Sequence, residues 1–217
     1  MLQIKTGQTL LFTGDSITDC GRSYPLGAGS GLGNGYVKLI DCLLASSYPK
    51  TAIRILNTGI NGNRVTDLRD RWQKDIQIYK PDWLSFMIGI NDVWRQFDTP
   101  DDLTPVTPEQ FETTYRELLQ NLPKKTKPIL ATPFLIESKP TDPMRAMMDT
   151  YGSIVKKLAA KFNAHLVDTQ AAFDTYLKYR PSETLAEDRV HPNQTGHLIL
   201  AKAFLDSIGF DWKHNRS

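Results

Sequence analysis

The chain has 217 residues, and 40% of them are hydrophobic, which is enough for the core of one α/β domain. Its 26 basic and 24 acidic residues leave a net charge of only +2, and the scattered basic residues argue against a nucleic-acid-binding surface. We therefore expect a single domain over residues 1–217 with no nucleic-acid partner.

Short apolar runs alternate with longer segments of helical period, a pattern typical of a parallel sheet covered by helices on both faces. The expected strands span residues 9–14, 53–57, 83–87, 128–132 and 165–167. The expected helices span residues 36–46, 66–79, 108–121, 144–162 and 196–207. The segment 98–108, rich in proline and aspartate, is expected to be a surface loop. The pattern predicts an α/β protein with a five-stranded parallel sheet.

No segment has the features of a membrane span or a leader. No apolar run approaches the roughly 18 residues that a membrane helix needs. The apolar stretch near the N-terminus breaks at Gly14 and follows no basic leader, so we expect no signal peptide and a cytoplasmic protein. Cys20 and Cys42 form neither a CxxC pair nor a zinc spacing, and we expect both to be reduced.

Polar residues follow the expected strands at the edge where open α/β sheets place their working groups. Ser16 follows the first strand, residues 59–63 follow the second and residues 89–92 follow the third. Asp188 and His191 precede the last helix. We expect these segments to meet at one edge of the sheet.

Ser16 is the candidate nucleophile. It stands in Gly14-Asp15-Ser16, and Thr18 occupies the place of the second glycine in G-x-S-x-G, so the nucleophile elbow of α/β-hydrolases does not match. An isolated serine in such a turn more often only starts a helix. The aspartate and histidine near the C-terminus favour the interpretation of Ser16 as a nucleophile, because acyl transfer through a serine needs a base and a group that orients the base.

Asp188 and His191 are three residues apart, which allows the carboxylate to reach Nδ1 of the imidazole and leaves Nε2 free to accept the serine proton. The alternative is an aspartate that caps a turn beside an exposed histidine. The other three histidines have explanations in packing, capping or exposure, and these are His165, His197 and His214. Asp168 is a rival carboxylate, but we expect it to cap a helix that begins near Ala171.

Donors to a developing oxyanion are also present. Gly62 can present an unobstructed backbone N–H, Asn91 can point its side-chain amide inward, and Ser16 can add its own N–H. Ordinary turn chemistry is the alternative for the glycine, and an Asx turn is the alternative for Asn91. We expect Asp15 to brace the serine loop by hydrogen bonds.

The four blocks Gly14-Asp15-Ser16, Gly62, Asn91 and Asp188-x-x-His191 resemble those of the SGNH (GDSL-type) hydrolases, in the same order and over nearly the whole chain. The resemblance implies a flavodoxin-like three-layer α/β/α sandwich. It also implies that Ser16 is the nucleophile, that Asp188 and His191 complete the triad, and that Ser16, Gly62 and Asn91 form the oxyanion hole.

Longer strings, at residues 14–22, 87–96, 142–145, 167–173 and 188–192, resemble bacterial cytoplasmic acetylxylan esterases. This resemblance implies a serine esterase that removes acetyl groups from xylo-oligosaccharides or related sugars, and by analogy a homo-oligomer. One residue departs from the pattern, since Glu187 stands where the most similar of these esterases have an aromatic residue beside the acyl pocket.

Residues 92–108 offer groups suited to a sugar. Trp94 can stack on a sugar ring and Arg95 can bind its hydroxyls, so we assign both to substrate binding together with Asp15. Trp94 filling a gap in the core is an equal alternative. No amphipathic lid suggests a lipid substrate.

The remaining motifs predict no cofactor and no metal. The glycine-rich residues 27–35 contain no phosphate-binding pattern, and the chain has no H-E-x-x-H motif. Two alternatives for the function stay open. One is the same chemistry on lysophospholipid, thioester or aryl esters, and the other is a non-catalytic carbohydrate-binding module with the same fold.

Overall fold

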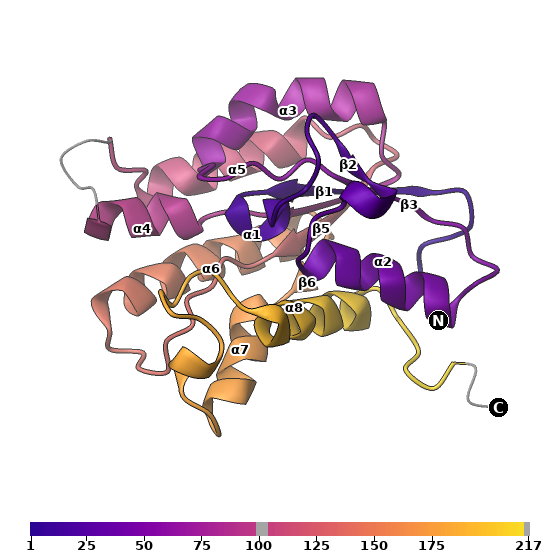
Figure 1. Cartoon of the computed structure of the whole chain (residues 1–217). Coiled ribbons are helices and arrows are strands. Elements are labelled where there is room, and N and C mark those ends of the chain that lie inside the picture. The colour runs from indigo at the N-terminus through magenta and orange to yellow at the C-terminus, as the bar shows by residue number, and fades with distance from the viewer. Residues whose placement is uncertain (99–103, 215–217) are drawn as a thin grey trace.

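A computed structural model describes residues 1–98 and 104–214 of the chain (Figure 1). The strands are β1 Thr9–Gly14, β2 Gly27–Ala28, β3 Arg54–Asn57, β4 Trp83–Met87, β5 Lys127–Ala131 and β6 His165–Val167. The α-helices are α1 Ser16–Asp19, α2 Tyr36–Ser47, α3 Val65–Tyr79, α4 Ile90–Asp98, α5 Pro108–Gln120, α6 Pro143–Lys161, α7 Thr169–Leu177 and α8 Gln194–Ser207. Two 3-10 turns complete the list, η1 Gly29–Gly31 and η2 Ser182–Thr184.

The strands form one sheet in the order β2-β3-β1-β4-β5-β6. The five expected strands are present and pair in parallel, and their order along the sheet is that of the flavodoxin-like folds. The α/β fold class is confirmed, but the expected strand count is corrected by β2, which pairs antiparallel with β3 at the edge. This strand has only two residues, from a glycine-rich segment without apolar alternation, so no sequence pattern marks it.

Helices cover both faces of the sheet. On one face Phe12 of β1 packs against Tyr36 of α2 and Phe204 of α8, with ring centroids 5.7 and 4.9 Å apart. On the other face Phe86 of β4 packs between Trp72 of α3 and Tyr115 of α5, at 5.3 and 4.9 Å. Figure 1 shows the sheet between these layers, which makes the domain a three-layer sandwich.

Two short helices, α1 and α4, were not among the expected elements. Helix α4 includes the first residues of the segment 92–108, and α1 begins directly after β1. Helix α7 was expected near Ala171 and begins at Thr169. Asp168 caps α7, since its Oδ1 accepts from the N–H of Ala171 at 3.2 Å as expected. Of the expected loop 98–108, residues 99–103 lie outside the described residues, and residues 104–107 form no helix or strand.

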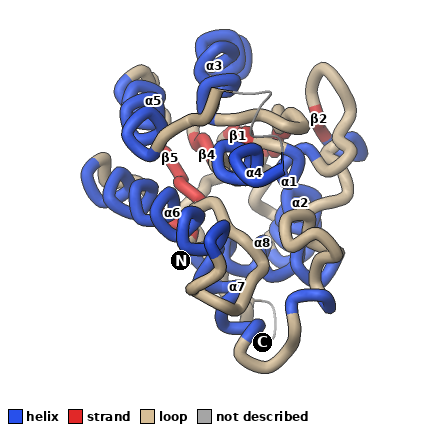
Figure 2. The backbone as a smooth tube through the Cα atoms, turned by 90° about the vertical axis from the view of Figure 1, so that its left-hand side faces the viewer, coloured by secondary structure: helices blue, strands red, loops and turns tan. Residues whose placement is uncertain are grey.

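The carboxyl ends of β1 and β4 are neighbours, and α1 and α4 begin there. Figure 2 looks at this end and shows α1 and α4 next to each other, between α3 and α8. The end of β1 approaches β4 and α1 so closely that position 14 requires glycine. A Cβ there would lie 2.3 Å from the carbonyl oxygen of Met87 and 2.6 Å from Oγ1 of Thr18. The strand order thus fixes the place where the polar loops meet.

Asn57, at the end of β3, holds α1 and its surroundings together. The side chain is fully buried, and Nδ2 donates to the carbonyl oxygens of Thr18 at 2.7 Å and Leu32 at 2.9 Å. Its Oδ1 accepts from the N–H of Gly59 at 2.9 Å. One buried amide therefore joins three segments of the chain.

Asn57→Ala is expected to lower the free energy of unfolding by about 3 kcal/mol, because it leaves buried backbone groups without partners. Urea unfolding of wild type and variant measures the change. The control is Asn121→Ala, which removes a single exposed bond to the carbonyl of Glu117 and should lower the stability by less than about 1 kcal/mol. Equal effects of the two substitutions would contradict the role of Asn57.

Candidate active site

Ser16 is the first residue of α1, and its position is fixed by the turn that starts the helix. Asp15 is the N-cap, and its Oδ1 accepts from the N–H of Ile17 at 3.0 Å. The hydroxyl Oγ of Ser16 lies 2.9 Å from Nε2 of His191, which is 175 residues away in the sequence. The structure therefore brings the two ends of the chain together at this serine.

His191 is held on its other side by Asp188. Its Nδ1 lies 2.6 Å from Oδ2 of Asp188, and Oδ1 of the same carboxylate accepts from the N–H groups of Val190 and His191 at 2.9 and 2.8 Å. Burial alone would raise the pKa of Asp188, but the hydrogen bonds from His191 and Val190 outweigh it and lower the pKa. The carboxylate is therefore charged and faces the imidazole.

The His191 and Asp188 side chains are 44% and 40% exposed, so a dissolved substrate can reach them. A cavity of about 390 Å³ opens beside them, lined also by Glu183, Glu187 and Pro192. The departure at position 187 thus places a carboxylate on the wall of this cavity.

The loop after β3 lies next to the start of α4. Gly62 is exposed with φ +77°, a left-handed conformation that favours glycine, and no atom lies within 4 Å of the place of a Cβ. Asn91 is buried, and its Nδ2 donates to the carbonyl oxygen of Asn63 at 3.1 Å. An amide nitrogen carries two hydrogens, and this bond uses one of them.

The three residues assigned to substrate binding differ in their positions. Trp94 is half-buried against the core, as one interpretation expected, and its ring makes an edge contact with His191 at 5.7 Å; its contact with a sugar stays a prediction. Arg95 lies over the Trp94 ring at 4.7 Å and pairs with Asp98 at 2.5 Å. Asp15 is 1% exposed, so its carboxyl braces the serine turn instead of facing the cavity.

Two buried carboxyl groups lie below this surface. Asp15 and Asp92 are each 1% exposed, and burial raises the pKa of each to about 7. Hydrogen bonds to backbone N–H groups oppose the rise, including those from Val65 to both oxygens of Asp92 at 3.1 and 3.2 Å. The two groups also disfavour each other's charge, since Asp15 contributes to the raised pKa of Asp92.

The other histidines have structural roles. His165 packs on Trp83 at 5.3 Å and His214 stacks on Tyr48 at 4.2 Å. His197 is buried; its Nδ1 accepts from the N–H of Tyr36, and burial lowers its pKa to about 4. Of the four histidines, His191 is the one hydrogen-bonded to Ser16.

Sequence reasoning missed two arginines that support the site. Arg71 of α3 donates to the carbonyl of Gly14 at 3.1 Å and to Oδ1 of Asn63 at 2.9 Å. Arg22 is buried, and its Nε donates to the carbonyl of Gly59 at 2.6 Å. Arg71 therefore ties the strand that ends before Ser16 to the loop that carries Gly62, and Arg22 ties the segment after α1 to the same loop. No local pattern marks them, because their partners are distant in the sequence.

Residues 1–98 and 104–214 contain no group of three His, Cys, Asp or Glu side chains that could form a metal site. None of the helices described is long and apolar enough to cross a membrane. Cys20 and Cys42 are both free thiols, as expected.

A serine, an imidazole and a carboxylate in one hydrogen-bonded chain, on an α/β/α sandwich, define the class of serine hydrolases. The model of the GDSL-like Lipase/Acylhydrolase family matches residues 12–199. The chain belongs to this family, which confirms the resemblance seen in the sequence.

Individual relatives are similar over their full length. An acetylxylan esterase of Geobacillus stearothermophilus is 51% identical over 99% of this chain and 100% of its own. The crystal structure of Axe2, an acetylxylan esterase of that organism, matches with a TM-score of 0.95 over 97% of this chain and 98% of its own, at 51% identity. LAE5, an α/β hydrolase enzyme from the metagenome of Lake Arreo in Spain, matches with a TM-score of 0.91 at 41% identity, over 97% of this chain and 99% of its own. Alanine variants of Axe2 at a serine, an aspartate and a histidine are described as catalytic mutants.

Asp92→Asn is expected to gain stability relative to wild type as the pH rises from about 4 to about 7. The pKa of Asp92 is raised from 3.8 to about 7 in the folded state, so the stability that the protonated carboxyl contributes is fully present below about pH 4. In that window the unfolded chain releases the proton and the folded protein keeps it. Wild type therefore loses up to about 1.4 kcal/mol per pH unit that the variant does not lose.

Urea unfolding of both proteins at several pH values measures this difference. The control is Asp70→Asn on α3, whose side chain is 69% exposed, and it should change the free energy of unfolding by less than about 0.5 kcal/mol. A pH-independent difference for Asp92→Asn would contradict the assigned protonation.

Proposed function

We propose that this protein is a serine esterase that removes acetyl groups from acetylated xylo-oligosaccharides or related sugars. The observation that carries the proposal is the hydrogen-bonded chain from Ser16 through His191 to Asp188. The full-length similarity to an acetylxylan esterase supports the substrate class.

In the first half of the reaction, Ser16 Oγ attacks the acetyl carbonyl and Nε2 of His191 takes the serine proton. Asp188 holds Nδ1 of the ring and stabilises the imidazolium. The carbonyl oxygen becomes negative and accepts hydrogen bonds from the N–H groups of Ser16 and Gly62 and from the side chain of Asn91.

The first half ends when the tetrahedral intermediate collapses: His191 gives its proton to the oxygen of the sugar, which leaves with its hydroxyl restored, and the acetyl group stays on Ser16. In the second half this acetyl-enzyme is hydrolysed. Water then enters, His191 takes a proton from it, and the resulting attack frees acetate and regenerates Ser16. The mechanism needs no cofactor.

We assign the sugar to the accessible side of His191. Trp94 offers an aromatic edge there, Arg95 lies beside it, and the neighbouring cavity carries Glu183 and Glu187, whose oxygens suit sugar hydroxyls. Asp15 contributes indirectly, through the turn that presents Ser16.

We also propose a cytoplasmic homo-oligomer. The exposed free thiol of Cys42 suits a reducing compartment. Tyr179 and Trp212 are 82% and 38% exposed, and such aromatic side chains are enriched at protein interfaces. Light scattering coupled to gel filtration should give a mass that is a multiple of 24.5 kDa, and a monomer over a wide concentration range would contradict the proposal.

Acetate release from a panel of acetylated sugars should fall by about 10³-fold or more in Ser16→Ala relative to wild type, because the variant lacks the nucleophile. Peracetylated xylobiose should be the better substrate when it is compared with sugar-free esters of increasing acyl length. Far-UV circular dichroism and urea unfolding check that the variant is folded.

Two outcomes of this experiment would contradict the proposal in different ways. Undiminished acetate release in Ser16→Ala would exclude the serine mechanism. A preference for acyl chains of about eight carbons or more would exclude the sugar assignment, since it would mean that the site binds a long apolar chain and not a sugar.

A further inference from the structure

Arg189 lies between the two residues that accompany Ser16, in the loop that carries Asp188 and His191. Its backbone has φ +65°, in the left-handed region that an arginine rarely adopts. A residue persists in this conformation when its surroundings hold it there. The contacts of Arg189 therefore bear on the positions of Asp188 and His191.

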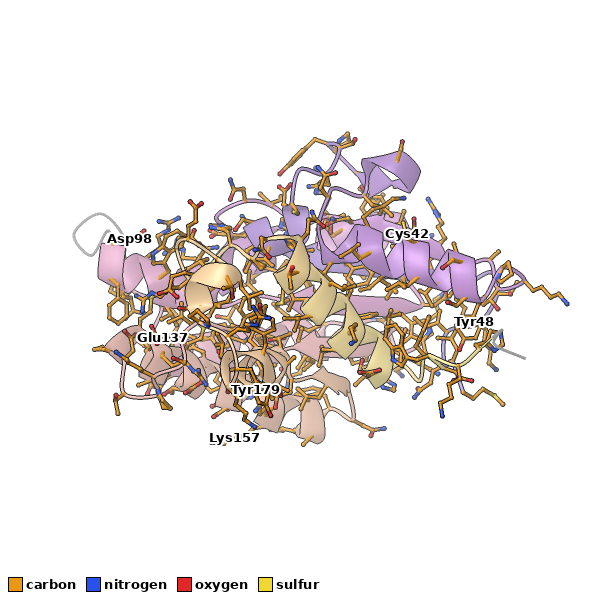
Figure 3. All side chains as sticks on the ribbon, turned by 60° about the horizontal axis from the view of Figure 1, so that its bottom comes forward. Cys42, Tyr48, Asp98, Glu137, Lys157 and Tyr179 are labelled. Atoms are coloured by element: carbon orange, nitrogen blue, oxygen red, sulfur yellow. The ribbon has the colours of Figure 1, made fainter. Side chains whose placement is uncertain are left out.

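The side chain and the backbone of Arg189 are both bound to the segment between β5 and α6. Nη1 donates to Oε2 of Glu137 at 3.0 Å and to Oδ2 of Asp142 at 3.1 Å, and the carbonyl oxygen accepts from the N–H of Ile136 at 2.9 Å. Figure 3 shows Glu137 at the end of the molecule toward Asp98 and away from Tyr48. The loop thus has three attachments to one neighbouring segment.

The two carboxylates that receive Arg189 are themselves fixed. Oδ1 of Asp142 caps α6 by accepting from the N–H of Arg145 at 3.0 Å, and Oε1 of Glu137 accepts from the N–H of Lys139 at 2.9 Å. The side chains of Glu137 and Asp142 are 14% and 23% exposed and that of Arg189 is 39% exposed, so the carboxylates form the more shielded side of the ion pairs. Burial alone would raise the pKa of both carboxyls, but hydrogen bonds from the backbone and Arg189 lower it, so both are charged.

The dyad beside Arg189 has little packing of its own, since both of its side chains are about two-fifths exposed. We propose that Arg189 is a positioning residue, which holds Asp188 and His191 within hydrogen-bonding reach of Ser16 through its ion pairs with Glu137 and Asp142. The inference rests on the proposed function, in which His191 is the general base. Proton transfer in the transition state is sensitive to small displacements of the base, so loss of this attachment lowers the rate of the chemical step.

The test uses hydrolysis of 4-nitrophenyl acetate, a small neutral ester that needs no sugar contacts. Arg189→Gln should lower kcat about tenfold, because the loop that carries His191 is displaced. It should change KM less than about twofold, because the ester still reaches the site. Arg189→Lys keeps the charge without the planar fork, and it should recover part of the loss. Arg180→Gln removes an exposed arginine from a nearby segment and should leave kcat unchanged.

A double-mutant cycle with Glu137→Gln locates the effect. If the ion pair is the path, Glu137→Gln lowers kcat as well, and the double variant falls less than the product of the two single effects. Circular dichroism and urea unfolding of each variant separate a displaced loop from a loss of fold. If Arg189→Gln does not fold, Arg189→Lys and Glu137→Gln provide the same kcat comparison.

Three results would overturn the proposal. They are a kcat of Arg189→Gln within twofold of wild type, fully multiplicative effects in the cycle, and a loss of kcat that only follows a loss of folded protein. None of them bears on the proposed function, which is judged by the activity of wild type against Ser16→Ala.

Discussion

One hydrogen bond, from Ser16 to Nε2 of His191, joins the beginning of the chain to its end. The sheet makes this contact possible, because β1 lies at the centre of the sheet. Helix α8 packs on the face of β1 that carries Phe12. The residues before α8 then reach the same edge as the residues after β1. The fold thus provides the site by placing two distant loops at the point where the strand order reverses.

The three carboxyl groups around this contact differ in their ionisation. Asp188 is ionised and faces the imidazole, whereas burial raises the pKa of Asp15 and Asp92 to about 7. Below that pH the two buried groups are protonated and do not repel the negative oxygen that forms on the acetyl carbonyl. Asp188, the carboxylate that assists the proposed reaction, therefore differs from Asp15 and Asp92 in its hydrogen bond to His191 and in its exposure to solvent.

The sequence predicts the parts of this structure that follow local rules. The five parallel strands have buried apolar runs, and the spacing of Asp188 and His191 is short enough to be judged from the chain alone. Helix α4 was not among the expected elements, and the prolines and aspartates that predicted a surface loop belong to residues 98–108, at and beyond its end. Residues 90–98 form this helix, which carries Trp94 to His191.

The supporting residues could not be predicted, because their roles depend on partners far away in the sequence. Asn57 binds Thr18 and Leu32, Arg71 binds Gly14, and Arg189 binds Glu137. None of these side chains stands in a pattern that differs from an ordinary surface or turn residue. Their importance comes from burial and long-range contact, which only the folded chain displays.

The most direct test of the account is to find where an acetyl group is attached during turnover. Wild type mixed with 4-nitrophenyl acetate and quenched in acid within the first turnovers should carry one acetyl group, and mass spectrometry of its peptides should locate the group on Ser16. Acetylation of another side chain, or hydrolysis with no acetylated peptide in a quench faster than one turnover, would contradict it.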